Sequence, residues 1–390
     1  MRVILSTYDS RGGVEPLAAL ALRLRAMGAE AIVCAPPDCA ARLDELGVPL
    51  VPVGRPAKEI AHGERPAAPD VQRIAAGLIA AQFDGLAAAA QGCDAIVTSG
   101  LLPVAAGARS VAELLKVPAV NVSYCPIFLP SPHHRPSPLP GRPVPAEVHD
   151  PDELDAIDVA NHNAFLREPL NEHRAAAGLP PVDDVRAFVR GEQPWLAADP
   201  TLAPWPGGAD IVQTGAWFLR DERPLPSEVD SFLQAGTPPV YVSFGSMPAP
   251  AGFATSAISL IRAAGHRAIV GRGWAELAGV DDDADCLVIG EVNQQHLFRR
   301  VAAVVHHGGA GTTTTATRAG VPQVVVPQWA DQPYFADRVT ALGIGSRAAT
   351  FGDALRTALA PEVRERATAV AATIRTDGAS TASRLLLNMS

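Results

Sequence analysis

The chain has 390 residues, more than one hydrophobic core usually organises, so its length predicts two domains. Its 48% hydrophobic and 19% charged residues are typical of a folded globular protein, and its net charge of −9 argues against nucleic acid or an anionic membrane as the main partner. No stretch approaches the roughly 18 apolar residues of a membrane span, and the N-terminus does not resemble a signal peptide. The five cysteines lack C-x-x-C spacing, so we expect free thiols in a cytoplasmic protein.

The first half of the chain alternates short apolar runs with amphipathic stretches, the pattern of a parallel α/β sheet. Strands are predicted at residues 3–5, 31–34, 95–98 and 119–122, and helices at 15–27 and 71–90. Residues 125–151 are crowded with proline, which predicts a long irregular loop. For His133 and His134 in this loop, exposure to solvent is favoured over a metal site, because no companion ligands lie at a suitable spacing. A helix is predicted over 152–177.

The second half repeats the strand–helix alternation. Strands are predicted at 240–244, 268–270, 287–289, 303–305 and 323–326, and two final helices within 361–388 are broken near Gly378. Residues 200–239 are rich in proline and glycine, which indicates a linker between domains. We therefore predict two Rossmann-like α/β domains that face each other, residues 1–218 and 219–390.

Three loops at the carboxyl ends of predicted second-half strands, the edge where open α/β sheets bind ligands, carry the candidate site. They cover residues 243–246, 306–313 and 328–333. In the middle loop, Gly308, Gly309 and Gly311 can adopt backbone angles closed to other residues and would let a phosphate approach closely.

A helix is predicted to begin directly after these glycines. Thr312 and Thr313 are expected to cap it, and its dipole favours an anion. A tight turn without a ligand would also contain a Gly-Gly pair, but the preceding His306–His307 and the following Asp331–Gln332 favour a site for a diphosphate joined to a sugar. The spacing is not G-x-G-x-x-G, which argues against a nicotinamide cofactor.

Several segments resemble the nucleotide-sugar glycosyltransferases of the two-domain GT-B fold. They include MRVILSTYDSRGGVEPLAALALRLRAMGAEAIVCAPPDCAARL, AVVHHGGAGTT, VPQWADQPYFADRV, ADIVQTGAWFLRDERPL and GEVNQQHLF. The chain is similar over nearly its whole length to the actinomycete enzymes that glycosylate antibiotics of the vancomycin and teicoplanin type. This resemblance implies two Rossmann-like domains across a cleft, with the C-terminal helix packed back on the N-terminal domain. It also assigns the acceptor to residues 1–218 and the donor to residues 219–390. The proline-rich loop could be passive, but long ordered loops often form binding surfaces, so we favour a place for it in the acceptor cleft.

The resemblance further implies a role for individual residues. His307 would contact the diphosphate together with the backbone N–H groups of Gly309, Ala310, Gly311 and Thr312, whereas His306 would be a packed neighbour. Ser246 would line the same phosphate site, and Ser10 would approach the β-phosphate. Asp331 and Gln332 would hydrogen-bond the hydroxyls of the donor sugar. The nucleobase would lie near residues 272–274 and 291–294, which include Trp274 and Val292, although Trp274 could equally belong to the core.

One position departs from the family pattern. The first loop of the family usually reads Ser-Arg-Gly-Asp, and its acid is a proposed general base, but Gly13 occupies that place here. Asp9, Glu15 or Asp331 could supply the missing carboxylate, and Asp9 could equally be only a turn-forming residue. A phenolic acceptor, with a pKa of about 10, needs less help from a base than an aliphatic alcohol.

The resemblance implies an enzyme, an inverting O-glycosyltransferase that moves a hexose from a UDP- or dTDP-sugar to a glycopeptide aglycone or pseudoaglycone. Glucose or N-acetylglucosamine is favoured over a deoxysugar, because the Asp331–Gln332 pair is typical of relatives that use hexoses with intact hydroxyls. His307, Asp9 and Asp331 are the candidate catalytic residues. No cofactor besides the nucleotide sugar is implied, and no Asp-x-Asp motif points to a metal. Two alternatives stay open, namely a catalytically weak sugar-nucleotide-binding homologue and a sugar-nucleotide epimerase of the same fold.

Overall fold

The computed structural model describes residues 1–390 except 62–67, 248, 251, 274–282, 348–349 and 390. The chain divides into two compact units. The first contains Met1–Ala198, Pro204–Leu219 and Thr376–Ser390, and the second contains Asp199–Ala203 and Arg220–Arg375. The described helices include none that is both long and apolar enough to cross a bilayer.

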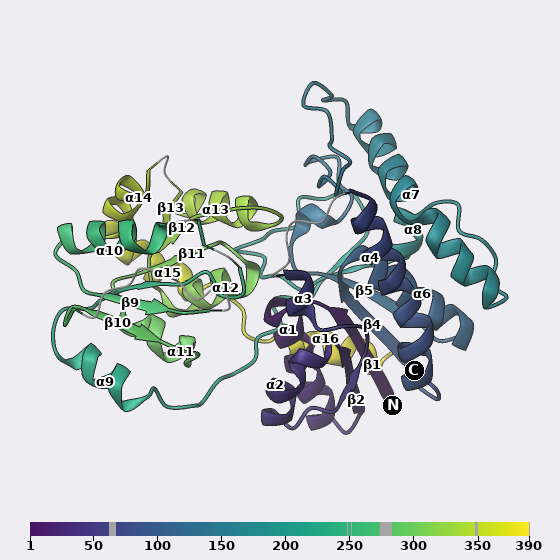
Figure 1. Cartoon of the computed structure of the whole chain (residues 1–390), viewed down its shortest axis with the longest axis horizontal. Coiled ribbons are helices and arrows are strands. Elements are labelled where there is room, and N and C mark those ends of the chain that lie inside the picture. Colours follow the sequence, from purple (N-terminus) through teal and green to yellow (C-terminus); the bar gives the residue numbers. More distant parts are fainter. Residues whose placement is uncertain (62–67, 248, 251, 274–282, 348–349, 390) are drawn as a thin grey trace. The chain divides into compact units, whose positions relative to one another are not determined.

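The first unit is built on a parallel sheet with the strand order β3-β2-β1-β4-β5-β6-β7 (Figure 1). The strands are β1 (Arg2–Tyr8), β2 (Glu30–Ala35), β3 (Leu50–Pro52), β4 (Ala95–Gly100), β5 (Ala119–Ser123), β6 (Trp195–Leu196) and β7 (Val212–Gln213). Strand β1 pairs with both β2 and β4, so the order of the strands reverses between β1 and β4. Such a switch point leaves a crevice at the carboxyl ends of the two strands.

Helices cover both faces of this sheet, which explains the nearly continuous apolar runs of its strands. They are α1 (Arg11–Ala26), α2 (Ala40–Glu45), α3 (Ala57–Ala61), α4 (Ala68–Ala81), α5 (Ala87–Ala89), α6 (Leu102–Leu115), α7 (Pro151–Ala176) and α8 (Val185–Arg190), with 3-10 turns η1 (Pro37–Cys39) and η3 (Pro126–Phe128). Val3 and Leu5 of β1 pack with α1, while Ile4 faces α6 on the other side. The predicted helix 71–90 is interrupted by the π-helical turn η2 (Gln82–Leu86), where Gln82 accepts a hydrogen bond from Ser6 Oγ.

The C-terminal helix α16 (Gly378–Leu387) belongs to the first unit, where it lies beside α1 (Figure 1). Its Ala382 and Leu386 join the core cluster that contains Leu17 and Leu20 of α1. The predicted second domain, residues 219–390, is therefore too long at its C-terminal end. The segment Thr376–Ser390 returns to the first unit because the apolar face of α16 is buried there.

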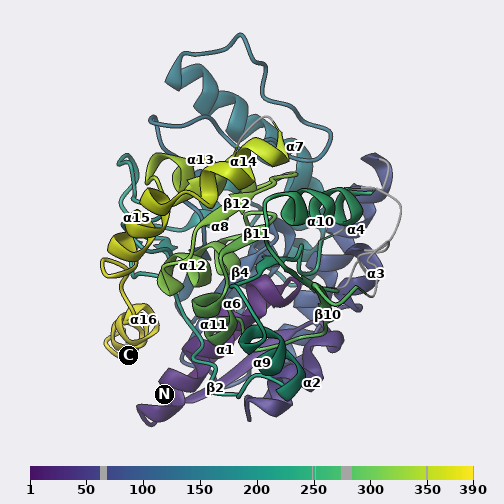
Figure 2. The same ribbon diagram turned by 90° about the vertical axis from the view of Figure 1, so that its left-hand side faces the viewer.

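The second unit has a parallel sheet with the order β10-β9-β8-β11-β12-β13, so its switch point lies between β8 and β11. The strands are β8 (Val240–Val242), β9 (Ala268–Gly271), β10 (Cys286–Ile289), β11 (Ala303–His306), β12 (Gln323–Val325) and β13 (Gly345–Ser346). The helices are α9 (Ser227–Gln234), α10 (Phe253–Ala263), α11 (Gln294–Leu297), α12 (Ala310–Ala319), α13 (Gln332–Ala341), α14 (Phe351–Ala358) and α15 (Pro361–Ala371), with the 3-10 turn η4 (Phe298–Arg300). Helices α10 and α14 cover one face of the sheet, and α9, α11 and α12 cover the other (Figures 1 and 2). The predicted pair of Rossmann-like α/β domains is confirmed.

Candidate functional site

The turn after β11 joins the switch point of the second unit to the start of α12. Gly308 has a φ of 94°, and a Cβ there would lie 2.7 Å from Val325 Cγ1, so only glycine fits this close approach. Gly309 is the N-cap and brings no side chain to the helix. The prediction that Thr312 and Thr313 cap α12 is wrong, because both lie inside the helix and Thr313 Oγ1 donates back to the Gly309 carbonyl at 2.9 Å. The helix therefore presents its first N–H groups without a capping side chain at Gly309.

His306 is a fully buried structural residue. Its Nε2 lies 3.0 Å from Gln323 Oε1, and Gly308 N donates to its Nδ1 at 3.1 Å. Because Gln323 uses its amide nitrogen to donate to Thr317, its oxygen must accept, which fixes the proton of His306 on Nε2. Burial lowers the pKa of His306 to about 3, so the ring is neutral.

His307 directly follows β11 at the carboxyl edge of the sheet, and it lies beside the loop that follows β8. A Cβ on Gly245 would be 3.7 Å from its Cε1, and one on Gly309 would be 2.5 Å from its Nε2. Burial lowers its pKa to about 4, so the imidazole is neutral near pH 7. Its Nδ1 is buried and has no hydrogen-bond partner among the described residues. A buried, unsatisfied ring nitrogen beside a helix N-terminus is suited to hydrogen-bonding a ligand.

The loop after β8 approaches the same place. Ser243 N donates to the Val305 carbonyl, and Ser243 Oγ accepts from Gly245 N at 3.3 Å. Gly245 has a φ of 61°, and a Cβ there would lie 3.7 Å from His307 Cε1, so the residue before Ser246 lies close to the His307 ring. The structure thus brings the loops of Ser246 and His307 to one switch point, as the order of the strands requires.

The loop after β12 places Asp331 at the start of α12. Its carboxylate accepts hydrogen bonds from the backbone N–H of Ala310 and from its own N–H, yet burial raises its pKa to about 6. The side chain of Gln332 is buried, and its Oε1 accepts from Gln328 N at 2.8 Å and from Trp329 N at 3.2 Å. The oxygen of Gln332 therefore holds the loop in shape, while Asp331 lies at the positive end of a helix.

This burial of Asp331 predicts a pH-dependent gain in stability for Asp331→Asn. A carboxyl group whose pKa is raised by folding binds protons more tightly in the folded state, so the wild type loses stability as the pH rises from about 4 to about 6. Asparagine does not titrate. We expect the variant to gain about 1 kcal/mol relative to the wild type between pH 4.5 and pH 7.5, less than the full shift implies because the side chain is partly exposed. Thermal unfolding at both pH values measures this, and an equal difference at the two would contradict it.

The residues near which the family resemblance implies a nucleobase are only partly described. Trp274 lies outside the described residues. Val292 packs at the edge of the core cluster of α9, α11 and α12, between β10 and α11. The neighbouring Asn293 caps α11 and donates through Nδ2 to the carbonyls of Asp221 and Arg223, which ties this loop to the start of the second unit.

In the first unit, Asp9 and Ser10 follow β1 at the switch point between β1 and β4. Ser10 is the N-cap of α1, and its N–H donates to Asp9 Oδ1 at 2.6 Å. Glu15, the second carboxylate near this loop, forms ion pairs with Arg11 at 3.0 Å and with Arg42 at 2.8 Å. Glu15 is thus committed to a partly buried ion-pair network, while Asp9 lies at the sheet edge.

Tyr124 also belongs to this edge, although no sequence motif marks it. Its hydroxyl donates to the Gly13 carbonyl at 3.3 Å and lies 3.1 Å from Ser99 Oγ, so it links the ends of β4 and β5 to the first turn of α1. Trp329 is a second residue that sequence reasoning missed. It is 57% exposed, two positions before Asp331. Its place after β12 is the signal that could have singled it out.

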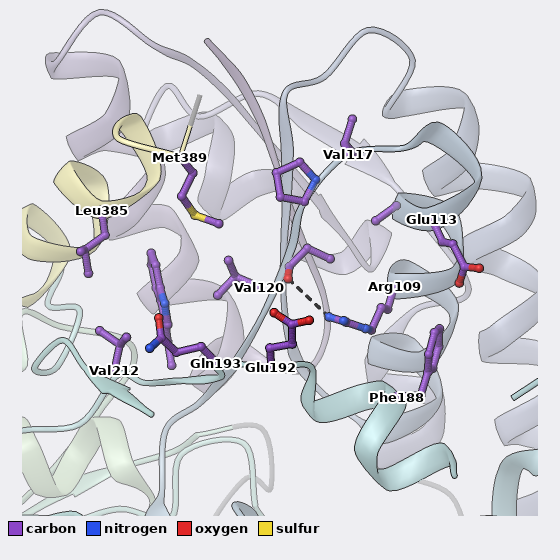
Figure 3. A pocket seen from close by; sticks show the side chains of 14 residues that line it. Arg109, Glu113, Val117, Val120, Phe188, Glu192, Gln193, Val212, Leu385 and Met389 are labelled. Atoms are coloured by element: carbon purple, nitrogen blue, oxygen red, sulfur yellow. Dashed lines mark hydrogen bonds between the residues drawn. The ribbon is translucent and has the colours of Figure 1, made fainter. Parts of the chain in front are cut away.

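A pocket of about 660 Å³ in the first unit lies at the opposite edge of the sheet, at the amino ends of β5, β6 and β7 (Figure 3). Arg109 and Glu113 of α6 line it together with Trp195 and with Met389 beyond α16. None of the candidate site residues lines it. His133 and His134 lie in the proline-rich loop, where His134 packs edge-on against Trp205. The described residues contain no cluster of three or more His, Cys, Asp or Glu side chains that could hold a metal ion.

Comparison with known proteins shows which family this chain resembles. Residues 283–384 match the family "Erythromycin biosynthesis protein CIII-like, C-terminal domain". The chain is 56% identical to glycosyltransferase GtfE of Amycolatopsis orientalis, over 99% of this chain and 97% of the relative. It is 53% identical to the vancomycin aglycone glucosyltransferase of the same organism, over 100% and 97%, and 46% identical to its dTDP-epi-vancosaminyltransferase, over 95% and 93%.

Solved structures show the same fold at lower identity. The glycotransferase of kitacinnamycin superposes with a TM-score of 0.73 at 23% identity, covering 99% of this chain and 98% of that chain. The glycosyltransferase VinC in complex with dTDP gives a TM-score of 0.67 at 19% identity, covering 99% of both. The chain therefore belongs to the vancomycin-type glycosyltransferases, nucleotide-sugar-dependent enzymes of the GT-B fold.

Proposed function

We propose that this enzyme transfers a hexose from a UDP- or dTDP-sugar to a hydroxyl of a glycopeptide aglycone or pseudoaglycone, with inversion at the anomeric carbon. Support for the acceptor class comes from the relative named as a vancomycin aglycone glucosyltransferase, which is similar over the whole chain. In this proposal the first compact unit binds the acceptor, and the second binds the nucleotide sugar.

The observation that carries the donor site is the N-terminus of α12 beside His307 at the β8–β11 switch point. A diphosphate there accepts hydrogen bonds from the N–H groups of residues 309–312 and from His307, with Ser246 as a further donor. These fixed donors stabilise the charge that develops on the leaving diphosphate. Because His307 is neutral, it supplies a hydrogen bond and not a full charge.

The proposal includes a sugar subsite and a nucleobase subsite. Asp331 and Gln332 hydrogen-bond the sugar hydroxyls, and the nucleobase lies near Val292 and, as the family resemblance implies, near Trp274, which is outside the described residues. Asp331 then has two states, because its carboxylate occupies the N–H of Ala310 when no diphosphate is bound. The diphosphate and the carboxylate repel each other, so donor binding moves Asp331 from the helix end towards the sugar. A pair of groups that bind hydroxyls favours glucose or N-acetylglucosamine as the transferred hexose.

A donor and acceptor panel tests the proposed function. UDP-glucose, UDP-N-acetylglucosamine and a dTDP-deoxysugar are each incubated with vancomycin aglycone and its monoglycosylated form, and products are identified by mass spectrometry. We expect transfer from an intact hexose and no epimer when the acceptor is omitted. An epimer formed from donor alone indicates an epimerase. Donor binding without transfer across the whole panel indicates a binding protein.

A methyl group on Gly311 tests where the diphosphate lies. Gly311 is the second residue of α12, and a Cβ there meets no protein atom within 4 Å. Alanine is favoured over glycine inside helices by about 1 kcal/mol, so Gly311→Ala should not lower stability. Because side chains tilt towards the helix N-terminus, the added methyl should weaken UDP binding about tenfold by calorimetry.

Gly352→Ala is the matched control, because Gly352 is the second residue of α14 and a Cβ there makes only an ordinary contact, 3.9 Å from Leu260. It should leave the affinity for UDP unchanged. Equal UDP affinities of the two variants would contradict a diphosphate site at the start of α12.

A further inference from the structure

The backbone conformation of residue 13 does not explain why this residue is a glycine. Gly13 lies in the first turn of α1 and is not among the residues with positive φ, so any side chain could adopt its conformation. Alanine would be the better helix former at this place. Helix geometry alone therefore gives no advantage to glycine here.

The explanation lies in the side chain of Asp9. A Cβ built on Gly13 would lie 2.6 Å from both Asp9 Cβ and Asp9 Oδ2, and 2.8 Å from Asp9 Cγ. Such distances are well inside van der Waals contact, so a methyl group at position 13 would displace Asp9, including its Cβ, which no change of rotamer can move. The neighbouring Gly12 differs, because a Cβ there meets nothing within 4 Å.

The surrounding contacts hold the Asp9 carboxyl group in this place. Its Oδ1 accepts from Ser10 N at 2.6 Å, and the start of α1 favours its negative charge. The Tyr124 hydroxyl lies 3.3 Å from the Gly13 carbonyl and 3.1 Å from Ser99 Oγ, which fixes the first turn of α1 against the end of β4. The carboxylate is thus partly exposed, oriented, and located at the switch point of the first unit.

We propose that Gly13 is a positioning residue that makes room for Asp9, and that Asp9 is the base for the acceptor hydroxyl. This inference rests on the proposed function. The acceptor proton passes to an Asp9 carboxylate oxygen while the acceptor oxygen bonds to the anomeric carbon. The bond from that carbon to the diphosphate breaks, and its electron pair leaves with the diphosphate. Gly13 takes part only through the place that it leaves for Asp9.

Gly13→Ala compared with Gly12→Ala tests the inference directly. Both variants add one methyl to the first turn of α1, but only the first displaces Asp9. A displacement of about 1 Å at a reacting group costs on the order of 100-fold in rate, so we expect kcat of Gly13→Ala to fall about 100-fold. KM for the donor and UDP affinity should stay near those of Gly12→Ala, whose kcat should match the wild type. The melting temperature of Gly13→Ala should be lower than that of Gly12→Ala, because relief of the contact with Asp9 Cβ requires a shift of the backbone.

A double-mutant cycle with Asp9→Asn separates positioning from a general structural effect. If Gly13 acts through Asp9, adding Gly13→Ala to Asp9→Asn should lower kcat by less than threefold, because the base is already absent. The acid limb of the pH profile of kcat should be lost in both single variants. The inference would be overturned if the losses of the two single variants multiplied in the double variant, or if Gly13→Ala kept the kcat of the wild type. In either case, sugar transfer by the wild-type enzyme would leave the proposed function intact. If the wild-type enzyme transferred no sugar, both the inference and the proposed function would be contradicted.

Discussion

Asp9→Asn should lower kcat by about 10²- to 10⁴-fold, the usual contribution of a general base, with little change in KM for the donor. Asparagine keeps the size of the side chain and an oxygen that can accept from Ser10 N, so the turn after β1 is preserved. It cannot take the acceptor proton. With a phenolic acceptor, whose own pKa is about 10, the loss should lie near the lower end of this range.

Steady-state kinetics with phenolic and aliphatic hydroxyl acceptors measures the effect, and Glu15→Gln is the control. Glu15 is the other carboxylate near this loop, but it pairs with Arg11 and Arg42. Its neutral variant should keep kcat within about threefold of the wild type, because two arginines hold the Glu15 carboxylate and the proposed reaction does not use it. If Glu15→Gln lost activity and Asp9→Asn kept it, the base would be misassigned.

His307→Ala should lower kcat by about 10²- to 10³-fold, the effect of removing one fixed donor to a developing negative charge. The ring is buried and neutral beside the start of α12, so its hydrogen bond acts where solvent screening is weak. Because the leaving diphosphate gains charge in the transition state, kcat should fall more than the affinity for the intact donor.

The control for this position is His307→Gln, which retains an amide N–H donor and should keep more activity than the alanine variant. His306 is unsuitable as a control, because its contacts with Gln323 and Gly308 make it part of the core. Turnover and UDP affinity that are unchanged in His307→Ala would show that this histidine is not part of the phosphate site.

The strands and the glycine-rich turn were accessible from sequence because each has a local signature. Strands covered by helices on both faces read as short apolar runs, and β1, β4, β8 and β11 all appear in this way. The turn after β11 is marked by Gly308, whose positive φ and close contact with Val325 leave no alternative residue. Two-residue strands such as β13 carry too few residues for any periodic pattern, so β13 was not predicted.

The remaining features depend on contacts between distant segments. The bond between the Asp331 carboxylate and Ala310 N–H exists because β11 and β12 are neighbours in the sheet. The proximity of Asp9 to Gly13 depends on the backbone of the turn after β1 and on the rotamer of Asp9, and the packing of α16 on α1 joins the two ends of the chain. The capping role expected for Thr312 and Thr313 failed because the hydroxyl of Thr313 turned back to a carbonyl of the preceding turn.

The proposed function depends most on the diphosphate site at the start of α12, and a crystal structure with bound UDP or dTDP tests this site most directly. We expect phosphate oxygens within hydrogen-bond distance of the N–H groups of residues 309–312 and of His307, with the Asp331 carboxylate moved away from Ala310. A nucleotide bound elsewhere, with Asp331 still on Ala310 N–H, would contradict it.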